Sequence, residues 1–72
     1  MKGENNRMKH FIIQDMVSGA CVAMIDAKNG KTALKRFKMG LMSSGCYEIH
    51  KENSEWILSS SYGSYFKAIE RR

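Results

Sequence analysis

The sequence predicts an α+β fold of order ββαββα, in which an antiparallel sheet of about four strands carries one long helix on one face and a short C-terminal helix. Two observations lead to this prediction. Four short runs rich in β-branched and aromatic residues are separated by polar or glycine-containing connections, which is typical of β-hairpins. Two other segments repeat their apolar residues at helical spacing.

The first predicted hairpin joins "HFIIQDM" (10–16) to "ACVAMIDA" (20–27). Gly19 lies in the connection between them and can adopt the positive φ that a tight hairpin turn needs. Both runs are apolar at alternating and at intervening positions. This pattern predicts strands that are covered on both faces.

The long helix is predicted over "NGKTALKRFKMGLMSSG" (29–45), with Asn29 as its N-cap and "SSG" (43–45) as its stop. The lysines lie on one side of the predicted helix, and a stripe of apolar residues lies on the opposite side. The expected core stripe consists of Ala33, Leu34, Phe37 and Leu41, and Met39 and Met42 are expected on the basic side.

The second predicted hairpin joins "CYEIH" (46–50) to "EWILSS" (55–60) through the polar connection "KENS". Tyr47 and Ile49 are expected on one strand face, packed with Trp56 and Leu58.

The C-terminal segment could be a strand or a helix. Its apolar residues form one helical stripe, and a serine precedes that stripe as a potential cap, so the helix is the prediction. The stripe consists of Tyr62, Tyr65, Phe66 and Ile69, and the capping residue would be Ser61 or Ser64.

A chain of 72 residues is long enough for one small domain, which we assign to residues 9–72, after a polar, disordered leader at residues 1–8. No run approaches the ~18 apolar residues of a membrane span, and no apolar segment follows the basic N-terminal residues. We therefore expect a cytoplasmic protein. Cys21 and Cys46 are then expected to be reduced, partly buried thiols.

The net charge of +5 is concentrated in residues 28–38, which contain five basic residues and no acidic one. A solvated helix face would have this pattern, and so would a surface that binds nucleic-acid phosphates or an acidic protein. Exposed methionines beside the lysines favour a protein partner. The predicted binding residues are Lys28, Lys31, Lys35, Arg36, Lys38, Met39 and Met42.

A secondary binding site is considered at "SSSYGS" (59–64), where hydroxyl groups and the start of the predicted helix would converge on an anion. Its members would be Ser61, Tyr62 and Ser64. Ordinary capping of the helix by serine explains the same residues and is the preferred interpretation.

Catalysis, metal binding and cofactor binding are not expected. Cys46 and His50 would be ~13 Å apart along a strand, which is too far to chelate one ion. The sequence contains no paired metal-ligand motif, and its carboxylates are scattered over turns and strand ends.

The hairpin followed by the helix start "AKNGKTAL" (27–34) and a second hairpin is similar in style to small proteins of bacterial phages and mobile elements. The leading hypothesis is a non-catalytic protein-interaction module that modulates or inhibits a larger nucleoprotein machine. Direct nucleic-acid binding through residues 28–42 is the alternative, and a self-associating assembly protein is the second alternative. Exposed sheet edges make strand addition or a homodimer conceivable.

Overall fold

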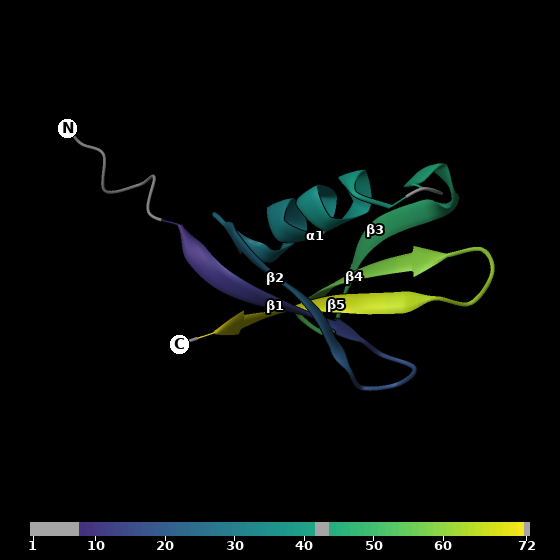
Figure 1. The fold of residues 1–72 in the computed structure, drawn as a ribbon, viewed down its shortest axis with the longest axis horizontal. Coiled ribbons are helices and arrows are strands. Elements are labelled where there is room, and N and C mark those ends of the chain that lie inside the picture. Colours follow the sequence, from purple (N-terminus) through teal and green to yellow (C-terminus); the bar gives the residue numbers. More distant parts are fainter. Residues whose placement is uncertain (1–7, 42–43, 72) are drawn as a thin grey trace.

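A computed structural model describes residues 8–41 and 44–71. The disordered leader predicted for residues 1–8 thus lies outside the described residues, except for Met8. The described strands form one antiparallel sheet in the order β2-β1-β5-β4-β3 (Figure 1). The elements are β1 (Lys9–Asp15), β2 (Cys21–Ala27), α1 (Gly30–Met39), the 3₁₀ turn η2 (Ser44–Cys46), β3 (Tyr47–Glu52), β4 (Glu55–Ser60) and β5 (Tyr65–Arg71).

Helix α1 covers one face of the sheet (Figure 1). Ala33 and Leu34 are fully buried on the underside of the helix, and Phe37 and Leu41 are partly buried beside them, as the sequence predicts. Successive side chains of a strand point to opposite faces, so only every second strand residue reaches this core. The strand residues in the core are Phe11, Ile13, Ala27, Tyr47, Leu58 and Ala68.

The start of α1 is the one predicted, but its end is not. The Asn29 side chain accepts a hydrogen bond of 2.8 Å from the Thr32 backbone N–H, which confirms the N-cap. The helix ends at Met39, and the N–H of the C-cap residue Gly40 donates to the Phe37 carbonyl. Glycine disfavours helix by about 1 kcal/mol, so the helix ends before the predicted "SSG" stop. Ser44 and Gly45 belong to η2, and Ser43 lies outside the described residues.

The predictions of about four strands and of a C-terminal helix are wrong, because residues 65–71 form a fifth strand in the middle of the sheet. In β5, Ala68 lies opposite Ile13 of β1 on one side and opposite Trp56 of β4 on the other. Phe66 and Ala68 face α1, whereas Tyr65 and Ile69 face the other way. A strand with apolar residues on both faces resembles a helical stripe in sequence, and backbone pairing with two neighbours decides in favour of the strand.

Tight turns join the strands of each hairpin. Gly19 has a φ of +82°, as predicted for the first turn. In the β3–β4 turn, Asn53 and Ser54 both have positive φ, which is the conformation of a two-residue hairpin turn. Gly63, at φ +94°, turns the chain from β4 into β5.

The expectation that residues 10–27 are covered on both faces is also wrong, since α1 covers only one. On the opposite face Met24 is 63% exposed and Val22 is 45% exposed. In contrast, the predicted packing in the second hairpin is confirmed. Ile49 pairs with Leu58, and Tyr47, Ile49, Trp56 and Leu58 all contribute to the core below α1.

Gly30 is a position where the first turn of α1 approaches the sheet closely. A Cβ at Gly30 would lie 2.9 Å from Trp56 Cδ1, which is closer than two carbons can approach. We predict that Gly30→Ala lowers the free energy of unfolding by about 1–3 kcal/mol, because this overpacking outweighs the better helix propensity of alanine. Urea denaturation followed by circular dichroism measures the change.

Gly40→Ala is the matched control. Its Cβ would lie 3.6 Å from the Phe37 carbonyl oxygen, an ordinary contact, and φ at Gly40 is −87°. This variant should be as stable as the parent or slightly more stable. Equal losses in both variants would contradict the close approach at Gly30.

Candidate binding cleft between α1 and β3

A shallow cleft of about 260 Å³ lies between α1 and the edge strand β3. Its α1 residues are spaced so that they share one side of the helix, because positions three, four, seven and eight apart lie on the same face. We call this site the basic cleft. It is lined by Lys31, Lys35, Lys38, Met39 and Ile49.

The packing of α1 against the core determines the direction in which its lysines point. Ala33 and Leu34 are fixed in the core, so residues about 100° away around the helix face the β3 side. The Lys31 amino group lies 5.7 Å from the centroid of the Trp56 ring, and the Lys51 amino group lies 5.5 Å from the same ring. These cation–π contacts hold two positive charges near the start of α1.

The positive charge of α1 is not neutralised by the part of the chain that the structure describes. Its ion pairs there are Lys9–Glu70, Lys67–Glu55, His10–Asp26 and His50–Glu52. None of these pairs includes a lysine or arginine of α1. The cleft therefore presents clustered positive charge to solvent beside an apolar side chain, since Met39 is 82% exposed.

The structure brings together only part of the predicted binding surface. Four of the predicted binding residues share one surface, because all of them line the basic cleft. They are Lys31, Lys35, Lys38 and Met39. Lys28 and Arg36 are exposed but do not line it. Lys28 precedes the N-cap of α1, and Arg36 lies about 100° around the helix from Lys35. Met42 lies outside the described residues.

Sequence reasoning missed the contribution of Ile49. It placed Ile49 in the core, where it does pack, but Ile49 is only half-buried and also lines the cleft. This dual position follows from β3 being an edge strand, with a neighbour on one side only. Nothing in the local sequence distinguishes an edge strand from a central one.

The predicted secondary site lies in the β4–β5 turn and does not precede a helix. The Ser64 N–H donates to Ser60 Oγ at 2.9 Å, and the Ser60 N–H donates to the Ser64 carbonyl at 2.9 Å. Ser61 is exposed, and its N–H donates to the Cys46 carbonyl. The capping role predicted for Ser61 or Ser64 is therefore wrong, and these residues make turn hydrogen bonds instead.

Tyr62 in the same turn is 59% exposed but is anchored to the core. Its hydroxyl group donates to the Tyr47 hydroxyl at 3.2 Å, and the two rings pack edge to face with centroids 5.9 Å apart. The hydrogen bond with Tyr62 and the burial of the Tyr47 ring raise the pKa of the Tyr47 hydroxyl above its ordinary value of 10.0. Tyr62 thus has a packing role that limits its freedom to bind a ligand.

The remaining chemistry-bearing residues do not form a second centre. Across residues 8–41 and 44–71, no three His, Cys, Asp or Glu side chains gather where they could hold a metal ion. Cys21 and Cys46 are free thiols and are exposed rather than partly buried, which corrects the expectation for both. No helix in the described ranges is both long enough and apolar enough to cross a membrane.

Comparison of this chain with protein-family models, with curated proteins and with solved structures gives no significant match.

The raised pKa of Tyr47 predicts a loss of stability at high pH. The folded state favours the neutral hydroxyl, so the stabilisation is fully present below pH 10 and is lost as pH rises through the higher folded pKa. The free energy of unfolding should therefore fall less steeply above pH 10 in Tyr47→Phe than in the parent protein. Urea denaturation at several pH values measures this slope, and identical slopes would contradict the coupling.

Proposed function

We propose that this protein is a non-catalytic interaction module whose basic cleft binds an acidic segment of a partner protein. The observation that supports this proposal is the composition of the cleft. Three lysines surround a methionine that is almost fully exposed, and Ile49 adds apolar surface beside them. Such a site offers ion pairing and apolar contact to the same ligand, which suits a peptide that carries both acidic and apolar side chains.

The edge strand β3 supports an extended conformation for that segment. An edge strand presents backbone N–H and C=O groups that an incoming strand can pair with. A peptide added beside β3 would point alternate side chains toward the α1 face of the sheet. Acidic residues at those positions would meet the lysines of the basic cleft.

Direct binding of nucleic acid is the second candidate function, favoured by the absence of ion pairs to the lysines and arginine of α1 within the described residues. Two features make it the weaker candidate. The cleft has apolar surface at Met39 and Ile49, where a phosphate backbone gains nothing. Trp56 is half-buried with Lys31 and Lys51 close to its ring, so it does not offer an open face for base stacking.

We place this activity in the cytoplasm, because the exposed thiols of Cys21 and Cys46 suit a reducing compartment. The proposed role is that of a modulator or inhibitor of a larger nucleoprotein machine, as in small proteins of phages and mobile elements. An acidic surface that normally meets a basic protein is a natural target for such a basic cleft.

Two variants of neighbouring helix residues test the proposal. Lys35→Glu reverses a charge inside the cleft, and Arg36→Glu reverses a charge on the same helix outside it. The probe is a short fluorescein-labelled peptide that repeats Glu-Thr-Val-Thr, so that Glu and Val share one face of an extended strand. Binding is followed by fluorescence anisotropy at about 0.15 M salt, where screening confines charge effects to about 8 Å. We expect Lys35→Glu to weaken binding by roughly three- to tenfold, because it removes one exposed ion pair and adds a repulsion. Arg36→Glu should change binding by less than about twofold.

Single-stranded and double-stranded DNA and RNA oligonucleotides, labelled in the same way, are the comparison ligands. Equal losses of peptide binding in both variants would show that only the overall positive charge matters, and would contradict a defined cleft. Tighter binding of an oligonucleotide, with a steep dependence on salt, would support the second candidate function instead. Absence of peptide binding at low salt would overturn the proposal.

A further inference from the structure

Two rows of side chains cross the sheet below α1 and give the basic cleft two unlike ends. The residues of each row lie opposite one another on β3, β4 and β5. The first row is Lys51, Trp56 and Ala68, and the second row is Ile49, Leu58 and Phe66. Residues two positions apart along a strand share a face, so the rows are about 6.6 Å apart.

Helix α1 runs from the first row to the second. Its first residue, Gly30, packs so closely on the first row that a Cβ there would lie 2.9 Å from Trp56 Cδ1. Near the end of the helix, the Phe37 ring packs edge to face on the Phe66 ring of the second row, with centroids 5.1 Å apart. The helix and β3 therefore run in opposite directions along the two sides of the cleft.

The end of the cleft at the first row is cationic. Lys31 and Lys51 are exposed, and their amino groups lie 5.7 and 5.5 Å from the centroid of the same Trp56 ring. The ion pairs within residues 8–41 and 44–71 include neither lysine. Two like charges beside one ring repel each other, and a carboxylate that approaches them offsets this repulsion. An apolar side chain at the same place would only remove water from the ammonium groups.

The end of the cleft at the second row is more apolar. Met39 is 82% exposed, and the half-buried Ile49 lines the cleft with it. Lys35 and Lys38 line the helix side of the cleft. On the strand side, the two ends therefore differ by one substitution of chemistry, an ammonium group at Lys51 and an apolar side chain at Ile49. An apolar side chain of the ligand gains by covering Met39 and Ile49, whereas a carboxylate there loses water beside them.

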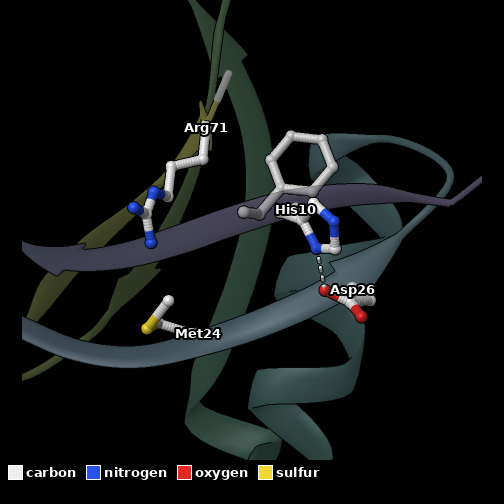
Figure 2. Close-up of a pocket in the computed structure, with 5 residues that line it drawn as sticks. His10, Met24, Asp26 and Arg71 are labelled. Carbon is white, nitrogen blue, oxygen red and sulfur yellow. Dashed lines mark hydrogen bonds and ion pairs between the residues drawn. The ribbon is translucent and has the colours of Figure 1, made fainter.

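The other edge of the sheet does not suit an acidic segment. Edge strand β2 carries Asp26, whose Oδ1 lies 2.6 Å from His10 Nδ1. Figure 2 shows this pair and Arg71 around a hollow of about 360 Å³. The charges of Asp26 and Arg71 are opposite, so the hollow has no excess positive charge comparable with that of the basic cleft. The pairing of β2 with β1 also shifts register at Ile13 and Gln14, and such an irregularity disfavours strand addition at an edge.

We propose that the basic cleft prefers a partner segment in which an acidic residue is followed two positions later by an apolar residue. This inference rests on the proposed function, because it assumes that the segment adds to β3. The described strand pairs are antiparallel, and antiparallel pairing is slightly the more stable arrangement. In an antiparallel addition, the partner residue opposite Lys51 precedes the residue opposite Ile49 by two positions. The preferred pattern is therefore acidic-x-apolar.

The reverse order does not satisfy both ends of the cleft in any antiparallel register. When the acidic residue of an apolar-x-acidic segment lies opposite Lys51, its apolar residue lies opposite Asn53, in the β3–β4 turn. When the apolar residue lies opposite Ile49, the acidic residue lies opposite Tyr47, at the far end of β3 from Lys51. Each register loses either the ion pair or the apolar contact.

Competition binding tests the order. The competitors are two unlabelled peptides of the same composition, Glu-Thr-Glu-Thr-Val-Thr-Val and its reverse, Val-Thr-Val-Thr-Glu-Thr-Glu. Both are acetylated and amidated, so that their terminal charges do not differ. Each displaces the fluorescein-labelled Glu-Thr-Val-Thr repeat peptide from the full chain at about 0.15 M salt. We expect the acidic-first peptide to bind about threefold or more tightly than its reverse, because one register gives it both contacts.

Lys51→Gln and Lys28→Gln are the matched variants, because each removes the charge of an exposed lysine and Lys28 lies outside the cleft. Lys51→Gln should reduce the preference between the two peptides to less than about twofold, whereas Lys28→Gln should leave it unchanged. Circular dichroism checks that both variants fold.

The outcomes separate this inference from the proposed function. If the labelled repeat peptide binds but the two competitors bind equally, or the reverse peptide binds more tightly, the ordered pattern is wrong and the proposed function stands. A preference that persists in Lys51→Gln would also overturn the ordered pattern. If the labelled repeat peptide does not bind, the proposed function and the ordered pattern fail together.

Discussion

The pairing of β5 with both β1 and β4 is the constraint on which the rest of the structure depends. Without β5, the two hairpins would be separate two-stranded units, and such units are marginally stable in water. The central position of β5 joins them into one sheet and brings Phe66 and Ala68 under α1. The edge positions of β2 and β3 follow from this closure.

A single helix on a five-stranded sheet gives the molecule two unlike faces (Figure 1). The α1 side contains the core and the clustered positive charge, and its cleft adjoins the β3 edge. On the other side, Val22 and Met24 are exposed. One helix packs on one face only, and the described residues include no second element that covers this face.

The sequence alone determined the elements whose signals are local. Asn29 caps α1, Gly19 turns the first hairpin, and the apolar stripe from Ala33 to Leu41 faces the core, because capping, φ preference and helical periodicity involve only residues close in the chain. The grouping of Lys31, Lys35, Lys38 and Met39 was predictable for the same reason.

Only the tertiary structure decided that residues 65–71 form a strand, since their periodicity fits a helix as well and long-range pairing with β1 and β4 settles the choice. It also decided that Ile49 lines the cleft and that Met24 is exposed, because strand order and the single covering helix are properties of the whole sheet and leave no local signal.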